Sequence, residues 1–220
     1  MTYFSEASFF RRLLDQNGIQ PKLILVIGCG TGDEPHYVQH ATNAFVVAVD
    51  LEIRQKPSDS DALQLLQANA EILPFRTSTF DAIYCYHTLE HVRRDQTAIS
   101  EMQRVLAMKG IAFVGTPNKL RLIGYIAGRN TTLHNFFIWN LHDYWMRLTF
   151  RWANDKGAHA GFSDNELRGM LTHRFSCVEN VSLGYYASKF PKVQKLWSLI
   201  FKLHLEPFIA QSLYYIAMKL

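Results

Sequence analysis

The chain has 220 residues and a formal net charge of +4, with 48% hydrophobic and 19% charged residues, a balance that is ordinary for a globular protein. Its length allows one sizeable core and favours a single domain, residues 1–220, over two. Because the chain shows no signal-peptide pattern at its start, no apolar run near the roughly 18 residues of a membrane span and only three scattered cysteines, we expect a cytoplasmic protein with reduced thiols, no disulfide framework and no metal site.

The first half of the chain alternates between apolar runs and helical patterns. Residues 23–27 and 45–49 are continuous apolar runs, which is typical of strands buried on both faces of a parallel sheet. Apolar residues within 96–106 recur at helical spacing, and Lys109-Gly110 is predicted to close this helix. In chain order the sequence predicts helices at 4–15, 34–41, 62–66 and 96–106, and strands at 23–27, 45–49, 65–68, 80–85 and 111–115.

The second half of the chain is less regular. Residues 119–160 are rich in aromatic and basic side chains, several of them at helical spacing, so we expect a helical insertion after the fifth strand that covers the substrate. Strands that alternate with helices predict an α/β fold with a doubly wound, mostly parallel sheet of seven strands and helices on both faces. Beyond the insertion the sequence predicts a helix at 164–173 with Ser163 as its N-cap, a strand at 177–183, a helix at 193–205 and a strand at 213–218.

Charge is distributed unevenly along the chain. Residues 1–118 hold 10 Lys and Arg against 13 Asp and Glu, whereas residues 119–220 hold 13 against 6. A basic second half is consistent with an anionic contact such as a lipid head group, a phosphate or an acidic substrate, and equally with a solvated face. The basic residues are spread over the half rather than gathered in a stripe, so nucleic acid is disfavoured as a partner.

A glycine-rich turn, Gly28-Cys29-Gly30-Thr31-Gly32, lies between the first predicted strand and the next helix. Such a turn lets the backbone approach a ligand where side chains would clash. The dinucleotide fingerprint requires a further glycine where Asp33 stands. The turn alone therefore indicates a ligand site or a plain tight connection, and does not identify a cofactor.

Asp50 ends the second predicted strand. A carboxylate at this position can accept hydrogen bonds from both hydroxyls of a ribose. NAD and S-adenosylmethionine share that ribose, so Asp50 indicates an adenosine ligand without choosing between them. A capping or loop aspartate is the simpler alternative.

Several segments across residues 22–118, taken with the glycine turn and Asp50, decide between these cofactors. In order and spacing they resemble the class I S-adenosylmethionine-dependent methyltransferases, within the group that includes the ubiquinone and menaquinone biosynthetic enzymes. The resemblance implies a Rossmann-like fold and S-adenosyl-L-methionine as cofactor. The segments are Asn69–Phe75, Phe80–Ile83, Leu89–Val92, Glu101 with Arg104–Leu106, Lys109-Gly110 and Thr116–Asn118, with a late match at His159–Ser163.

The resemblance also implies roles for individual residues. Two departures from the family pattern are Val26, where an acidic residue is usual, and Asn69, where aspartate is frequent. By resemblance, Gly28, Gly30 and Gly32 border the methionine part of the cofactor, Asp50 binds the ribose, Leu51 lies against adenine, Asn69 and Ala70 lie at the adenine edge, and His87 lies near the sulfonium and the substrate.

A sulfonium methyl group is already activated, so the protein has to align the reactants and exclude water. If the acceptor is a hydroxyl, a histidine of near-neutral pKa is the usual general base. His87 and His142 are the predicted substrate contacts, although a capping or packing role is the simpler reading of each, and His91 is expected to serve structure near the cofactor.

The acceptor itself has to be inferred from the aromatic, basic second half. We expect a small, hydrophobic or lipid-like molecule, with oxygen slightly favoured over carbon as the methylated atom. The predicted helix at 193–205 places lysines beside an apolar face, which suits either an anionic membrane surface or a packed core or dimer helix. Two other functions stay open: a non-catalytic cofactor-binding scaffold, which Val26 and Asn69 favour, and a nicotinamide-dependent reductase, which Asp33 disfavours.

Overall fold

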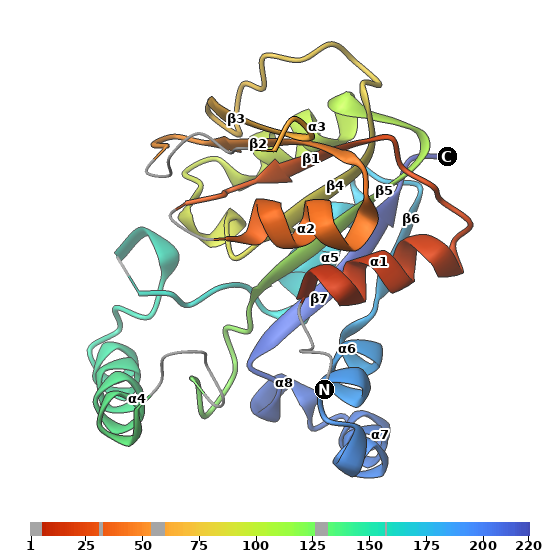
Figure 1. Cartoon of the computed structure of the whole chain (residues 1–220). Coiled ribbons are helices and arrows are strands. Elements are labelled where there is room, and N and C mark those ends of the chain that lie inside the picture. The colour runs from red at the N-terminus through yellow and green to blue at the C-terminus, as the bar shows by residue number, and fades with distance from the viewer. Residues whose placement is uncertain (1–5, 31–32, 54–59, 126–131, 157) are drawn as a thin grey trace.

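A seven-stranded sheet forms the centre of the computed structural model, which describes residues 6–30, 33–53, 60–125, 132–156 and 158–220 (Figure 1). The strands lie in the order β3-β2-β1-β4-β5-β7-β6. β1 to β5 run parallel, whereas β7 is antiparallel to both of its neighbours, in agreement with the predicted mostly parallel sheet. The strands are β1 (Leu23–Ile27), β2 (Phe45–Asp50), β3 (Leu63–Gln67), β4 (Phe80–Tyr86), β5 (Leu106–Pro117), β6 (Cys177–Asn180) and β7 (Ser212–Met218).

The central strands are buried on both faces, which explains the continuous apolar runs in the sequence. In β1, Ile24 and Val26 belong to one core, while Leu25 and Ile27 belong to the other. Successive side chains of a strand point to opposite faces, so a strand covered on both sides needs an apolar residue at every position. Val26 therefore stands in a packed core, where an acidic side chain would be costly to bury.

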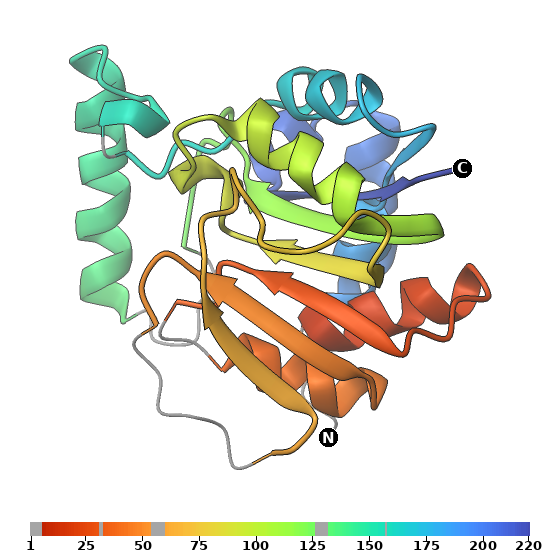
Figure 2. The same cartoon turned by 90° about the horizontal axis from the view of Figure 1, so that it is seen from above.

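Helices cover both faces of the sheet (Figures 1 and 2). The predicted N-cap at Ser163 is confirmed, because its Oγ accepts a hydrogen bond from the Glu166 N–H at 3.3 Å while Glu166 Oε2 accepts one from the Ser163 N–H at 2.8 Å. One core contains side chains of α1 (Glu6–Gln16), α2 (Glu34–Thr42) and α6 (Ser182–Lys189), and the other contains side chains of α3 (Asp95–Val105) and α5 (Asp164–Thr172).

Two predictions in the first half are wrong at the level of single elements. The helix predicted at 62–66 is absent, because residues 63–67 pair with β2 and form β3. Lys109-Gly110 does not close a helix, since α3 ends at Val105 and β5 begins at the next residue. In both segments, hydrogen bonding to a neighbouring strand determines the secondary structure. The neighbouring strand is distant in sequence, so a local residue pattern cannot predict this pairing.

Two predictions in the second half also need correction. The strand predicted at 177–183 stops at Asn180, whose side-chain oxygen accepts a hydrogen bond from the Ser182 N–H at 2.9 Å and leads the chain into α6. The helix predicted at 193–205 is shorter, and α7 (Gln194–Lys202) is followed by a separate short helix, α8 (Glu206–Ile209).

The helix α4 (Leu133–Leu148) stands away from the sheet in both views (Figures 1 and 2). Thr132 caps it by accepting a hydrogen bond from the Asn135 N–H at 3.1 Å. α4, α7 and α8 lie at the same end of the molecule (Figure 1). Among the helices that the structure describes, none is both long and apolar enough to cross a bilayer.

Candidate functional site

A large cavity of about 1210 Å³ lies at the carboxyl ends of β1 to β4. Its wall comes from the turn after β1, the end of β2, the residues after β3 and the segment 87–94 after β4. β1 lies between β2 and β4, so the strand order reverses at this point of the sheet. In open α/β sheets, ligands bind in the crevice that such a reversal leaves.

The glycine turn needs its first glycine for steric reasons. Gly28 has a φ of +80°, and a Cβ atom on it would lie 2.0 Å from Thr88 Oγ1. Thr88 is held in place because its hydroxyl donates to the Ile27 carbonyl at 2.9 Å. Gly30 has a φ of +50° with nothing within 4 Å of a Cβ, and it lines the large cavity. Gly32 lies outside the described residues.

Asp50 joins the end of β2 to the glycine turn. Its Oδ2 accepts a hydrogen bond from the Gly30 N–H at 2.7 Å, so the carboxylate fixes the turn as well as lining the cavity. A carboxylate oxygen has two lone pairs, which leaves acceptor capacity for the hydroxyl groups of a ligand. The sequence predicted Asp50 as a ligand contact and missed this second role.

The opposite rim of the large cavity contains an exposed apolar residue and a turn. Leu51 is 65% exposed, so a flat ring could cover it. Asn69 Oδ1 accepts a hydrogen bond from the Glu71 N–H at 2.9 Å and thereby shapes the turn that also contains Ala70. Part of the Asn69 acceptor capacity is thus already used within the chain, while its amide donor is left for a ligand.

An ion pair at this rim was not predicted. Arg94 Nε lies 2.7 Å from Glu71 Oε2, and both residues line the large cavity. Hydrogen bonds from the Arg94 side chain and backbone lower the pKa of the Glu71 carboxyl. The two residues are far apart in sequence and show no pattern of their own, so only the fold reveals the pair.

His87 forms part of the wall of both the large cavity and a second, small cavity. It has a left-handed φ of +50°, its N–H donates to the Gly115 carbonyl at 2.8 Å, and its Nε2 lies 3.3 Å from Ser212 Oγ. Burial, followed by the positive charge of Arg121, lowers the pKa of His87 to about 3. The side chain is 38% exposed because solvent reaches it through the cavities, while protein surrounds its other sides. The imidazole is therefore neutral near pH 7, and one of its two ring nitrogens carries a lone pair.

Glu90 is a buried carboxyl beside His87. Its side chain is only 1% exposed, and neither of its oxygens has a hydrogen-bond partner within the described part of the chain. Burial raises the pKa of Glu90 to about 7. In the sequence, the Leu89–Val92 segment contributes to the family resemblance, and no role was predicted for Glu90. A carboxyl with a strongly raised pKa, directly beside a residue that lines both cavities, is a functional candidate.

The small cavity has a volume of about 370 Å³ and a largely aromatic wall. Its rings belong to β4, the segment after β5, the region of α6 and β7, and they include a close stack of Tyr185 on Tyr214 at 3.8 Å. Burial raises the pKa of Tyr86 and of Tyr214 well above the ordinary value, so these hydroxyls stay protonated. The five aromatic residues of the wall are Tyr86, Tyr125, Tyr185, Phe190 and Tyr214.

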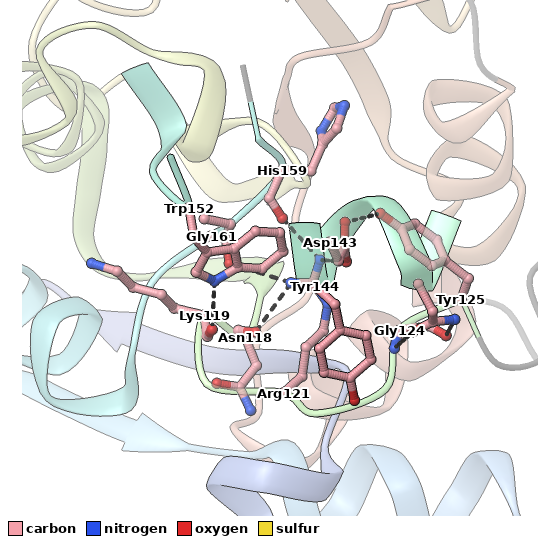
Figure 3. Close-up of polar contacts among 12 residues, drawn as sticks. Asn118, Lys119, Arg121, Gly124, Tyr125, Asp143, Tyr144, Trp152, His159 and Gly161 are labelled. Atoms are coloured by element: carbon pink, nitrogen blue, oxygen red, sulfur yellow. Dashed lines mark hydrogen bonds and ion pairs between the residues drawn. The ribbon is translucent and has the colours of Figure 1, made fainter. Parts of the chain in front are cut away.

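Arg121 connects the small cavity to α4 (Figure 3). It is 4% exposed, and its guanidinium lies 3.2 Å from Asp143 Oδ2 on α4. It also donates to the Asn118 and His159 carbonyls at 3.1 and 3.0 Å. These contacts fix the segment after β5 against α4, and none of this network was predicted.

Three other histidines differ in their position relative to the two cavities. His91 lines the large cavity and His159 the small one, with their rings 4.8 Å apart. His142 lies on the exposed side of α4 and lines neither cavity, so the structure does not bring it together with His87. Across the described ranges, no three His, Cys, Asp or Glu side chains lie close enough to hold a metal ion.

Comparison with known proteins gives matches over the part of the chain that builds the large cavity. Residues 25–114 match a family model described as a methyltransferase domain. The ubiquinone/menaquinone biosynthesis C-methyltransferase UbiE of Allorhizobium ampelinum is 36% identical over 98 residues, which cover 40% of this chain and 38% of that protein. A protein of Mycobacterium tuberculosis named "Probable S-adenosylmethionine-dependent methyltransferase" is 28% identical over 116 residues, which cover 51% of this chain and 41% of that protein.

The chain thus matches well under half the length of these curated relatives. Among solved structures, the YcgJ protein of Bacillus subtilis is similar over 97% of both chains, with a TM-score of 0.55 and 13% sequence identity. At this identity the likeness concerns the fold alone. It extends over the whole chain, including the part that the sequence relatives do not cover.

Proposed function

Because the chain belongs to the class I S-adenosylmethionine-dependent methyltransferases, we propose that it transfers a methyl group from S-adenosylmethionine to a small, hydrophobic acceptor. One observation supports this proposal most directly: His87 forms part of the wall of both cavities, so a cofactor in the large one and an acceptor in the small one would meet at this side chain.

Both the position of the large cavity in the sheet and the residues that line it suit the cofactor. Gly28 and Gly30 bring bare backbone to its wall, as the methionine part requires. Asp50 has acceptor capacity for the ribose, and the exposed Leu51 offers an apolar surface for adenine. The residues at the adenine edge are Asn69 and Ala70.

The small cavity fits a flat, largely apolar acceptor that carries a hydroxyl group. Aromatic rings form much of its wall, and neutral His87 offers a lone pair beside them. Bound S-adenosylmethionine supplies an activated methyl group and leaves as the thioether after the transfer. With a pKa of about 3, His87 is a weak base, so it would accept a hydrogen bond from the hydroxyl and take its proton only as the oxygen gains the methyl group. On this ground oxygen is the favoured acceptor atom. Arg121 and Lys189 line the same cavity, but both are already paired with carboxylates.

Residues 119–160 would act as the cover of this acceptor site. Arg121 and Tyr125 come from this segment and line the small cavity. A hydrophobic acceptor is concentrated in membranes, so we also propose that the basic, aromatic second half makes peripheral contact with a membrane. His142, exposed on α4, has no place in this proposal as a substrate contact.

Calorimetric titration with S-adenosylmethionine, S-adenosylhomocysteine and NADH tests the cofactor assignment. We expect binding of the first two, and Asp50→Ala should weaken it by ~1–3 kcal/mol, because the ribose loses its acceptor and the glycine turn loses its anchor. Asp61→Ala, an exposed aspartate outside the cavity wall, is the matched control. Binding of NADH alone would overturn the proposal in favour of a reductase.

Methyl transfer itself requires a second readout. The protein is incubated with S-adenosylmethionine and a metabolite extract of its host, and masses are searched for the gain of one methylene unit. A protein-dependent gain supports the enzyme. Cofactor binding without any such gain would favour the non-catalytic scaffold over the methyltransferase.

A further inference from the structure

The outward side of α4 is apolar and uncharged. Leu133, Phe137, Leu141, Trp145 and Leu148 are each between 61% and 80% exposed. Their spacing of three to four residues places them on one side of the helix. The single acidic residue of α4 is the buried partner of Arg121, so this exposed side presents no carboxylate.

The helix α7 is apolar on two sides. On its inner side Trp197 stacks on Tyr186 with the ring centres 4.1 Å apart, and Ile200 is buried. On its outer side Leu196, Leu199 and Leu203 are 53%, 49% and 56% exposed. The sequence predicted one apolar face that included Ile200. The structure instead leaves a separate stripe of leucines uncovered, flanked by the exposed lysines Lys192, Lys195 and Lys202.

The segment 120–125 is hydrogen-bonded to α4 and to α8, the short helix that follows α7. The Leu122 N–H donates to the Phe208 carbonyl of α8 at 2.8 Å, and the Tyr144 hydroxyl of α4 donates to the Leu122 carbonyl at 2.7 Å. Leu122 and Ile123 are themselves about half exposed. We call the exposed sides of α4, segment 120–125 and α7 the apolar end surface, since all three lie at one end of the molecule (Figure 1).

We propose that the apolar end surface docks on a membrane that contains anionic lipids. Leucine, tryptophan and phenylalanine side chains that lie in the head-group region, with lysines beside them, are typical of proteins bound at an interface. Residues 189–206 contain four lysines and one glutamate, so their charge complements an anionic head group.

The same charges disfavour a second copy of the chain as the occupant. A two-fold symmetric dimer places the same patch of each copy face to face. The lysines beside the α7 stripe would then approach lysines of the partner, and residues 189–206 offer only one carboxylate to compensate them.

Docking at this end would bring the acceptor cavity to the lipid, a step that rests on the proposed function. Arg121 and Tyr125, which line the small cavity, flank Leu122 and Ile123 of the apolar end surface. Phe190 of the same cavity follows α6 and precedes the short turn that leads into α7. A lipid-like acceptor could thus pass from the bilayer to His87 without crossing bulk water.

Co-sedimentation of the whole chain with vesicles tests the docking. Vesicles of phosphatidylcholine alone are compared with vesicles that contain 30% phosphatidylglycerol. We expect binding to the anionic vesicles, decreased ~100-fold by Leu196→Gln, Leu199→Gln and Leu203→Gln together, because the apolar area that enters the lipid is lost. Lys192→Gln, Lys195→Gln and Lys202→Gln together should decrease it ~10-fold or more.

Matched controls come from the rest of the surface. Met108→Gln, at an exposed apolar residue of β5, and Lys22→Gln, at an exposed lysine before β1, should leave vesicle binding unchanged. Calorimetry with S-adenosylmethionine on every variant separates a loss of docking from a failure of the cofactor proposal.

Sedimentation velocity without vesicles tests whether a second copy of the chain covers the apolar end surface instead. Absence of binding to anionic vesicles would overturn the proposal, and so would leucine-dependent self-association that replaces vesicle binding. Equal binding to neutral vesicles would overturn its electrostatic part and leave only apolar insertion.

Discussion

His87 Nδ1 lies 3.5 Å from Oε1 of the buried Glu90, which is too far for a strong hydrogen bond. Burial lowers the pKa of His87 to about 3 and raises that of Glu90 to about 7. Both shifts favour the neutral forms. Near pH 7 the His87 imidazole is therefore neutral, whereas Glu90, with a pKa of about 7, is about half ionised. A neutral side chain at the junction between the two cavities suits an apolar acceptor.

The raised pKa of Glu90 predicts a stability change with pH. The folded state holds the carboxyl proton up to about pH 7, whereas the unfolded chain releases it near its ordinary pKa of 4.5. This contribution is fully present below pH ~4.5 and is lost as the pH rises through ~7. Between pH 5 and pH 8 the native protein should thus lose roughly 2–3 kcal/mol of unfolding free energy relative to Glu90→Gln, which cannot titrate.

Guanidinium unfolding of the two proteins at pH 5 and pH 8 measures this difference. The variant is needed because His87 acts in the opposite direction: its lowered pKa contributes stability that is present above pH ~6.5 and is lost as the pH falls toward 3. In the comparison of the two proteins that contribution cancels. A difference that stays constant from pH 5 to pH 8 would show that Glu90 has an ordinary pKa.

Substitution of His87 tests the proposed base. His87→Asn removes the imidazole while asparagine still tolerates the φ of +50° at this position. We expect the rate of methyl transfer to a hydroxyl acceptor to fall at least ~100-fold, the usual contribution of a general base, with S-adenosylmethionine binding retained. His142→Asn on the exposed side of α4 should change neither quantity. Equal effects of the two substitutions on the rate would remove His87 from the catalytic role.

The large cavity could be predicted from the sequence because each of its parts has a local signature. A strand buried on both faces appears as an apolar run, and the residues that follow β1 and β2 then necessarily lie at one edge of the sheet. Gly28 and Asp50 are placed there for that reason, and the structure connects them through the turn that Asp50 holds.

The small cavity could not be predicted, because its wall depends on distant strand pairing. β7 inserts antiparallel between β5 and β6, and this brings Tyr214 beside Tyr86, with their rings stacked 6.3 Å apart. The residue pattern around either tyrosine gives no signal that the two side chains are in contact. Glu90 was missed for a related reason, since only the complete fold shows that it is buried without a hydrogen-bond partner.

The two positive-φ glycines of the turn should differ in their tolerance of alanine. Gly28→Ala places a Cβ 2.0 Å from Thr88 Oγ1, so the turn or Thr88 must move, whereas Gly30→Ala meets no protein atom within 4 Å. We expect Gly30→Ala to cost ~1 kcal/mol of unfolding free energy from backbone strain alone, and Gly28→Ala at least ~2 kcal/mol more. Urea unfolding of the ligand-free proteins compares them directly. Similar losses would mean that Thr88 relaxes freely and that the close contact does not constrain the turn.

The ion pair between Arg121 and Asp143 should hold α4 against the rest of the molecule. Within the described residues, Arg121→Met leaves the buried Asp143 carboxylate with the Tyr125 hydroxyl, at 3.1 Å, as its hydrogen-bond donor, and breaking a buried ion pair by removing one partner costs ~3–5 kcal/mol. Since α4 stands away from the sheet, we expect the loss to appear first as faster hydrogen exchange of α4 amides, with the central strands still protected (Figures 1 and 3).

The double substitution Arg121→Met with Asp143→Leu decides whether charge is the reason. It removes both ionised groups and leaves apolar side chains of similar size, so protection of α4 should return in large part even though the hydrogen bonds of Arg121 to the Asn118 and His159 carbonyls are lost. If the double variant exchanges as fast as Arg121→Met, those carbonyl contacts, and not the ion pair, anchor α4. In that case Asp143→Asn, which keeps Arg121 and its carbonyl contacts, should leave the exchange of α4 nearly unchanged, whereas an anchoring ion pair requires Asp143→Asn to accelerate it.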